Sequence, residues 1–309
     1  MRSCGTVKFS IFAPMQAFGY HLALPFIYFL SILPFAVLRQ VSNFTYFILY
    51  RVWGYRKQVI LTNLRNSFPD KSEAEIQMIM RDFYRIFADT LIDTVKALTI
   101  SHEQLRKHCS ILNYEDVDAY IRRGKNVLLV LGHYGNWEYA GGSMAVHAPV
   151  PLKAAYKPLS NKYFNRLAVR SRTRLKIVLI PKRQLLKHLA DRADEQTLLV
   201  LIADQSPNPK DHHWVRFLHQ DTAVVSGMEK IARQYDYTVF YATIHPMNRG
   251  NYQIRFRLLT DDPNSLPPVK LTEMFMHELE QDILQYPAPY LWSHRRWKLK
   301  KPAGNPTVK

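Results

Sequence analysis

From residue 126 onward, short apolar runs alternate with helical patterns, and this alternation limits the folds open to the chain. The runs that predict strands are 127–131, 152–156, 176–180, 197–203, 238–244 and 252–258. Helices are predicted at 138–147, 162–174, 183–194, 223–235 and 271–285, and a capping box at Ser72 and Glu75 opens an earlier one at 72–98. Several strands are apolar almost throughout, as expected when both faces of a sheet are covered. The order predicts an α/β fold with a mostly parallel or mixed central sheet flanked by helices.

The first part of the chain has a different character. Residues 18–38 contain no Lys, Arg, Asp or Glu, and a bilayer span needs roughly 20 apolar residues, so this stretch is about long enough to cross a membrane. Pro25 and Pro34 interrupt it, so a kinked or re-entrant helix fits equally well, and the alternative is a buried helical hairpin of a soluble protein. We predict an N-terminal apolar helical membrane anchor at 1–58 and an α/β domain at 59–309.

Basic residues dominate the charge. The chain has 42 Lys and Arg against 25 Asp and Glu, a net charge of +17, which indicates a polyanionic partner: nucleic acid, an anionic membrane face or an acidic protein. Ten basic and no acidic residues lie between 157 and 187, and five more basic residues lie within 294–301. These runs suit phosphate groups or an acidic carrier. Arginines and lysines also follow the apolar stretch closely, which favours a cytoplasmic position for the rest of the chain.

A nucleic-acid partner would use the same charge, with Trp214, Trp292 and Trp297 as stacking platforms. No nucleic-acid-binding motif is present, and such a partner would leave the apolar N-terminal stretch unexplained. We therefore expect that nucleic acid is not a partner of this protein. A basic membrane-binding or nucleic-acid-binding protein without catalysis remains the rival class.

Several common kinds of site lack their sequence patterns. Cys4 and Cys109 form no CxxC pair, and the segment Asp211-His212-His213 has no established metal-ligand spacing. There is no GxGxxG or GxxxxGK[ST] motif for a nucleotide, and no GxSxG elbow for a covalent acyl-enzyme. We therefore expect no metal and no bound cofactor.

The sequence Gly132-His133-Tyr134-Gly135-Asn136-Trp137-Glu138 follows the strand predicted at 127–131. If His133 lies in a loop made tight by Gly132 and Gly135, Glu138 can reach the imidazole. A carboxylate on one ring nitrogen fixes the tautomer and leaves the other nitrogen free to accept a proton, as in a general base. Two other polar turns follow predicted strands, at Tyr156-Lys157 and at Asp204. Because sites gather at the carboxyl ends of such strands, the three turns could share one cleft.

These residues carry a resemblance. The segment 132–138 resembles the histidine–four residues–acid motif of the lipid A biosynthesis acyltransferase family, the late lauroyl/myristoyl transferases, within the wider lysophospholipid and glycerolipid acyltransferase group. Tyr156-Lys157-Pro158 with Asn161 resembles the second block, Ala203-Asp204-Gln205 the third, and 290–298 the closing block. Two positions depart from the pattern: Glu138 stands where many relatives of the wider group have Asp, and Lys157 where Arg is common.

The resemblance implies a membrane-associated enzyme that moves a fatty acyl chain from an acyl carrier protein thioester, or from acyl-CoA, to a hydroxyl of a lipid A precursor. The alternative acceptors are a lysophospholipid, an amino-acid lipid or a glycolipid. The resemblance also implies that His133 removes the proton of the acceptor hydroxyl while Glu138 holds the imidazole ring. It further implies oxyanion or substrate-binding roles for a larger set of residues: Asn136, Gly135, Arg170, Arg172, Asp204, Tyr156 and Lys157. The implied location is the bacterial inner membrane, with the catalytic domain on the cytoplasmic side.

Overall fold

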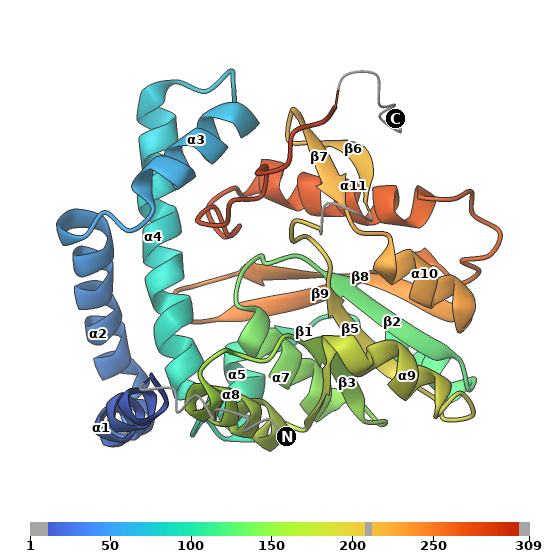
Figure 1. Ribbon diagram of the computed structural model, residues 1–309, viewed down its shortest axis with the longest axis horizontal. Helices are drawn as coiled ribbons and strands as arrows, with labels where there is room; N and C mark the ends of the chain where they lie inside the picture. Colours follow the sequence, from blue (N-terminus) through green and yellow to red (C-terminus); the bar gives the residue numbers. More distant parts are fainter. Residues whose placement is uncertain (1–11, 208–211, 303–309) are drawn as a thin grey trace, which may run out of the picture.

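The computed structural model describes residues 12–207 and 212–302, and its centre is a seven-stranded sheet in the order β1-β9-β8-β2-β5-β3-β4 (Figure 1). The strands are β1 (Cys109–Ile111), β9 (Tyr252–Thr260), β8 (Tyr237–Pro246), β2 (Asn126–Leu131), β5 (Leu198–Ile202), β3 (Leu152–Tyr156) and β4 (Ile177–Pro181). From β8 to β4 every neighbouring pair is parallel, whereas β9 is antiparallel to β8 and parallel to β1. The predicted α/β fold with a mostly parallel sheet is confirmed.

Helices cover both faces of the sheet, as the apolar strands require. In β2, Leu128 and Val130 belong to a core with α9 (Leu185–Ala190), α10 (Gly227–Gln234) and α11 (Lys270–Gln285). The alternate residues Val127, Leu129 and Leu131 belong to the opposite core, which includes α5 (His102–His108), α6 (Tyr114–Arg122) and α7 (Trp137–His147). α8 (Lys162–Arg174) packs beside the edge strand β4. The carboxyl ends of five parallel strands thus open at one edge between two helical layers.

Some predicted elements differ in the structure. The helix predicted at 223–235 begins only at Gly227, because residues 220–224 form β7 (Gln220–Val224), which pairs with β6 (His213–Phe217) in a separate hairpin. The helix predicted at 183–194 is shortened to α9. The strand predicted to begin at residue 176 begins one residue later, because Lys176 adopts a left-handed backbone with φ of 65°.

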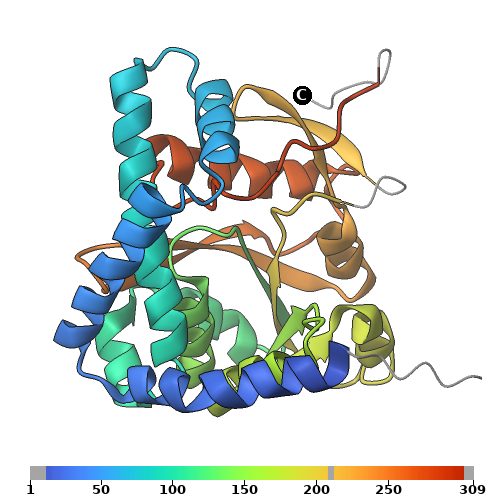
Figure 2. The same cartoon turned by 60° about the vertical axis from the view of Figure 1, so that its left-hand side comes forward.

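The N-terminal helices wrap one side of this domain. α1 (Phe12–Ile32) lies along α8, where the rings of Tyr20 and Tyr163 stack, and Figure 2 shows it crossing the side of the molecule. α2 (Phe35–Phe47), the π-helical turn η1 (Ile48–Val52) and α3 (Lys57–Ser67) follow, and α2 packs on the long helix α4 (Glu73–Lys96). The predicted capping box opens α4, with Ser72 and Glu75 bonded reciprocally. Lys96 at its other end donates to the carbonyls of Ser31 and Leu33.

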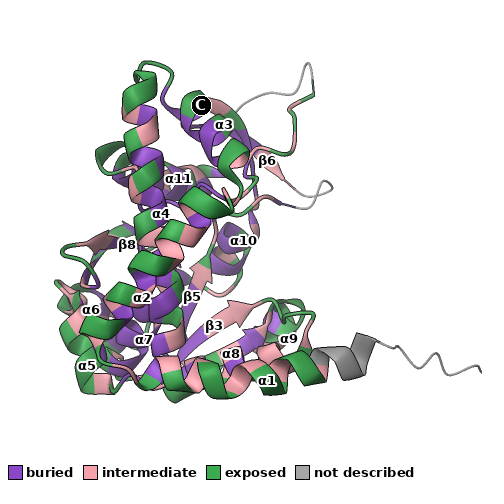
Figure 3. Cartoon of the chain, turned by 90° about the vertical axis from the view of Figure 1, so that its left-hand side faces the viewer, coloured by how far each residue is buried: buried purple, intermediate pink, exposed green. Residues whose placement is uncertain are grey.

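The break at Pro34 divides the apolar stretch 18–38 between two helices. Within 12–207 and 212–302, no helix combines the length and the apolar character needed to cross a bilayer. α1 instead exposes one apolar stripe, at Phe18, Leu22, Phe26 and Phe29, along its outer side (Figure 3). The physical reason is the sequence of α1 itself, where Pro25 and polar side chains interrupt the apolar residues.

Candidate active site

His133 lies in a short loop between β2 and α7, as the two flanking glycines predict. Gly135 has φ of 65°, and a Cβ at this position would meet the Ile244 carbonyl oxygen at 2.6 Å, so only glycine fits. The backbone of residues 289–291 holds the loop from the other side. There the amide of Leu291 donates to the carbonyl of His133 at 3.0 Å, and Gly135 donates to Pro289 at 3.2 Å.

Asp204, two residues beyond β5, is the acid that contacts the His133 ring. His133 Nδ1 lies 2.6 Å from Asp204 Oδ1, and the backbone amide of His133 donates to Oδ2 at 3.0 Å. The expected hydrogen bond from His133 to Glu138 is therefore wrong. Asn136 caps α7, so Glu138 is already the second residue of the helix and its side chain leaves the loop in another direction. Asp204, for which the resemblance implied an oxyanion or substrate-binding role, occupies the position that we assigned to Glu138.

Hydrogen bonds assign the tautomer of His133. Because an ionised carboxylate can only accept, Nδ1 carries the proton and donates to Asp204, which leaves the lone pair on Nε2. The side-chain Nε2 of Gln205 lies 3.2 Å from that ring nitrogen and can donate to it. The exposed fraction of the side chain is 14% for His133 and 3% for Asp204, so the pair is desolvated except at the free nitrogen.

Burial and charge act in opposite directions on the pair. Burial alone would lower the pKa of His133, but the Asp204 charge, its hydrogen bond and the more distant Glu138 charge outweigh it and raise the pKa. Burial alone would raise the pKa of Asp204, but His133 and then the Arg296 charge lower it. Asp204 is thus an ionised acceptor that makes His133 a stronger base than an ordinary histidine.

Glu138 pairs with Arg172 of α8. The guanidinium contacts both carboxylate oxygens, with Nε to Oε2 at 3.0 Å and Nη2 to Oε1 at 2.5 Å. This hydrogen bond, followed by the Glu138 charge, overcomes burial and raises the pKa of Arg172. The bidentate contact holds the planar guanidinium of Arg172 in a fixed orientation. The ion pair lies in the same region as His133, because the Glu138 charge also raises the pKa of that histidine.

Two expected oxyanion donors already have partners. Asn136 is fully buried; its Oδ1 accepts from the Tyr139 amide, and its Nδ2 donates to Asp93 at 3.1 Å. The Gly135 amide donates to Pro289, as described above. Neither group is free for a substrate oxygen, because the Asn136 amide nitrogen already donates to Asp93 and the Gly135 amide to Pro289. Arg172 is an expected donor that keeps an exposed edge, with 31% of its side chain accessible.

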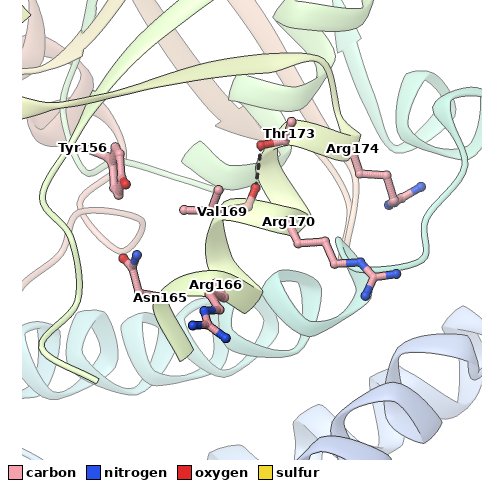
Figure 4. A pocket seen from close by; sticks show the side chains of 7 residues that line it. All are labelled: Tyr156, Asn165, Arg166, Val169, Arg170, Thr173 and Arg174. Atoms are coloured by element: carbon pink, nitrogen blue, oxygen red, sulfur yellow. Dashed lines mark hydrogen bonds between the residues drawn. The ribbon is translucent and has the colours of Figure 1, made fainter. Parts of the chain in front are cut away.

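A separate open pocket of about 660 Å³ lies over α8 (Figure 4). Its walls are Tyr156, Asn165, Arg166, Val169, Arg170, Thr173 and Arg174. Arg170 lines this pocket, whereas Arg172 faces Glu138, so the structure separates two arginines that we had grouped. Tyr156 at the end of β3 lines the pocket and also influences the pKa of Arg172, which connects the two places. Lys157 is exposed beside Tyr156.

The segment 287–297 contacts α3, the loop that carries His133 and the loop that carries Asp204. Asn63 of α3 donates to the carbonyls of Trp292 and His294, and Ser206 donates to the carbonyl of Arg296 at 2.7 Å. Tyr134, the residue after His133, forms an isolated antiparallel β-bridge with Tyr290. The resemblance gave a closing block at 290–298, but none of its residues was among the expected site residues. Among the residues that the structure describes, no cluster of three or more His, Cys, Asp or Glu could hold a metal ion.

The sequence matches a known protein family over nearly its whole length. The model of the bacterial lipid A biosynthesis acyltransferase family matches residues 9–299. The chain belongs to this family. Its membership confirms the resemblance seen in the sequence and indicates an acyltransferase.

Curated relatives of this acyltransferase are distant but match over most of their length. The palmitoleoyltransferase of lipid A biosynthesis in Escherichia coli K12 is 21% identical over 256 residues, 82% of each chain. The corresponding lauroyltransferase of the same strain is 22% identical over 299 residues, 91% of this chain and 94% of the relative. A lipid A biosynthesis acyltransferase of Haemophilus influenzae is 21% identical over 281 residues, 89% of each chain.

Proposed function

We propose that this protein transfers a fatty acyl chain from a thioester donor to a hydroxyl of a lipid A precursor, with His133 as the general base. The observation that carries the proposal is the buried His133–Asp204 pair with its lone pair on Nε2. The absence of a GxSxG elbow from the sequence supports direct attack by the acceptor hydroxyl. The family gives the acceptor class, and acyl carrier protein or acyl-CoA is the proposed donor.

In the proposed reaction, the acceptor hydroxyl replaces the Gln205 amide at His133 Nε2 and donates its proton there. The hydroxyl oxygen attacks the thioester carbonyl as the proton leaves, which gives a tetrahedral oxyanion and an imidazolium. Collapse of this intermediate breaks the carbon–sulfur bond, and the imidazolium returns the proton to the departing thiolate. Asp204 keeps the ring oriented and stabilises its positive charge. A general base positioned in this way contributes about 10²–10⁴ in rate.

Arg172 is the proposed electrostatic partner of the oxyanion or of a substrate phosphate. Its guanidinium is fixed by two hydrogen bonds to Glu138 and keeps an exposed edge. A preorganised donor of this kind costs no reorientation during the reaction. Glu138 then contributes through Arg172 rather than through contact with the histidine ring. This arrangement gives the acid of the motif a role that its position in α7 allows.

Peripheral membrane attachment supplies the lipid acceptor. The apolar side chains of α1 recur at helical spacing, with exposed fractions of 73% for Phe18, 71% for Leu22 and 62% for Phe26. The adjoining helix α8 exposes Lys162 and Arg166 and holds the basic pocket. An apolar stripe beside cations suits the headgroup region of an anionic leaflet. We infer that the protein lies on the cytoplasmic face of the bacterial inner membrane, with segment 1–58 as its contact.

The test is transfer of a radiolabelled acyl group from acyl carrier protein, or from acyl-CoA, to a lipid A precursor in anionic vesicles. The wild type should form the acylated lipid, and His133→Ala should abolish it while keeping the far-UV circular dichroism spectrum. Parallel reactions with a lysophospholipid, an amino-acid lipid and a glycolipid test the alternative acceptors. Near-normal turnover by His133→Ala would refute the mechanism, and failure to consume any donor would favour a binding protein without catalysis.

A further inference from the structure

Asp93 of α4 is a fully buried acid that contacts the loop carrying His133. Its Oδ2 accepts from Asn136 Nδ2 at 3.1 Å and from the Tyr252 hydroxyl at 2.9 Å. Its Oδ1 accepts from Arg39 Nη2. The three donors come from the loop before α7, from β9 and from α2. Because a buried carboxylate is costly unless it is paired and hydrogen-bonded, the three segments meet at this acid.

A second buried acid, Asp89, holds α2 beside this contact. Arg39 Nη1 lies 3.2 Å from Asp89 Oδ1, and Ser42 of α2 donates to the same oxygen at 2.5 Å. Arg249, in the turn between β8 and β9, donates to each oxygen of Asp89 at 2.9 Å. In Figure 1, α4 lies between α2 and the sheet. The guanidinium of Arg39 therefore has a fixed position against Asp93.

The contact with Asp93 sets the orientation of the Asn136 amide group. Burial raises the pKa of Asp93, and the charge of Arg39 opposes this rise. With a permanently charged guanidinium on Oδ1, the carboxylate acts as an acceptor, so the amide nitrogen of Asn136 turns toward it. The amide oxygen then accepts from the Tyr139 amide at 3.0 Å and caps α7. The start of α7 thus depends on an acid 43 residues earlier in the chain.

The first turn of α7 carries two side chains that define the surroundings of the base. Trp137 is its first residue, and its ring meets the His133 ring in a T-shaped contact with centroids 5.1 Å apart. Glu138 is its second residue and holds Arg172 through both carboxylate oxygens. A rotation of this turn would change both contacts together. A displacement of about 1 Å at a site can lower its rate about 10²-fold.

We propose that Asp93 is a positioning residue, which orients the first turn of α7 through Asn136, and that Arg39 makes the N-terminal segment a part of the active site. This inference rests on the proposed function of His133 as the base. Neither Asp93 nor Arg39 touches the substrate in this arrangement. Segment 1–58 then serves the geometry of the site as well as the contact with the membrane.

The test compares the full-length variants Asp93→Asn and Glu229→Gln. Glu229 is the matched control because it is also a buried acid: it pairs with Arg233 at 3.0 Å and accepts from Thr272 at 3.0 Å, but it lies on α10, which holds no residue of the site. The readouts are kcat and KM of acyl transfer, sedimentation with vesicles, thermal unfolding, and the NMR signals of the labelled His133 ring, assigned with His133→Gln. The NMR readout does not depend on turnover.

Asp93→Asn should lower kcat about 10²-fold with nearly unchanged KM and vesicle binding. It should also shift the His133 signals, because the Trp137 ring moves relative to the imidazole. Glu229→Gln should lower the Tm and leave kcat and these signals unchanged. If Asp93→Asn changes only the Tm, the residue is structural and the proposal is wrong. If no variant and no wild-type protein transfers an acyl group, the proposed function fails, and unchanged His133 signals in Asp93→Asn would separately refute the positioning role.

If Asp93→Asn does not fold, exchange of the two partners decides the question. Asn136→Asp alone sets two carboxylates against each other where an acid and an amide now lie 3.1 Å apart. Adding Asp93→Asn restores one donor and one acceptor to that contact. The double variant should therefore recover at least about tenfold in kcat over Asn136→Asp, as expected for coupled neighbours, and its His133 signals should return toward those of the wild type. Equal kcat and equal His133 signals in the two proteins would overturn the proposal.

Discussion

Replacing Asp204 with Asn separates the two acids that could serve the base. The substitution preserves the size of the side chain and removes its charge. In the wild type the carboxylate accepts from His133 Nδ1 at 2.6 Å and from the His133 amide at 3.0 Å. An asparagine can accept only one of these well, and its amide group can donate to Nδ1, which would move the proton to Nε2 and disable the base.

The expected loss follows from these two contacts. A hydrogen bond to a charged group contributes about 1.5–3 kcal/mol, and loss of the correct tautomer in a histidine–aspartate pair lowers kcat by up to about 10⁴-fold. We therefore expect Asp204→Asn to reduce kcat by about 10³–10⁴-fold with a smaller change in KM. Glu138→Gln is the matched comparison, because it removes a charge from the pair with Arg172 and leaves the His133–Asp204 contact intact.

Single-turnover transfer from radiolabelled acyl donor to lipid A precursor, between pH 5.5 and 9, measures both variants. Glu138→Gln should lower the rate by about 10–10²-fold, as expected for a weakened electrostatic donor, and should still bind lipid vesicles. Circular dichroism and thermal unfolding must show that each protein is folded. If Asp204→Asn works nearly as well as the wild type while Glu138→Gln loses all activity, the assignment of Asp204 as the partner of the base is refuted.

Three further outcomes are expected. Because the pKa of His133 is raised and only its neutral form accepts a proton, kcat/KM should increase with pH through a value above the ordinary histidine pKa of about 6.5; a midpoint below this value would contradict the electrostatics described above. Arg172→Met should lower kcat by about 10²-fold in the same transfer assay, and an unchanged kcat would exclude an oxyanion role. Replacing Phe18 and Phe26 together with Ser should weaken sedimentation with anionic vesicles by at least about 10²-fold, since each buried phenylalanine contributes about 1.5–3 kcal/mol. Leu112→Ser, at an exposed apolar position in the bend after β1, should not weaken it.

Local patterns in the sequence were sufficient for much of the fold. The apolar run at 152–156 and the helix at 162–174 have the same bounds in the structure, and Ser72 caps α4 through the contacts that its spacing predicts. These features depend on neighbours within a few residues. The β6–β7 hairpin was missed because its pairing partners lie in a region that reads locally as the start of a helix.

The histidine in its glycine-rich loop after a buried strand was also predictable, because the loop conformation is local. Its acidic partner was not. β2 and β5 pair in parallel with Leu131 opposite Ile202, so residues two positions beyond each strand, His133 and Asp204, lie side by side at the edge of the sheet. That pairing joins strands about 70 positions apart in the chain. Glu138, only five residues from His133, instead turns away with the helix.

The sequence by itself thus determined which side chains stand at the carboxyl ends of the strands, and with them the family and the candidate base. The tertiary structure decided which acid contacts His133 and which arginine pairs with the other acid. The physical reason is that a motif of neighbouring residues fixes backbone direction over one or two turns, whereas hydrogen bonds and charge compensation depend on which distant segments the sheet and the closing segment bring together.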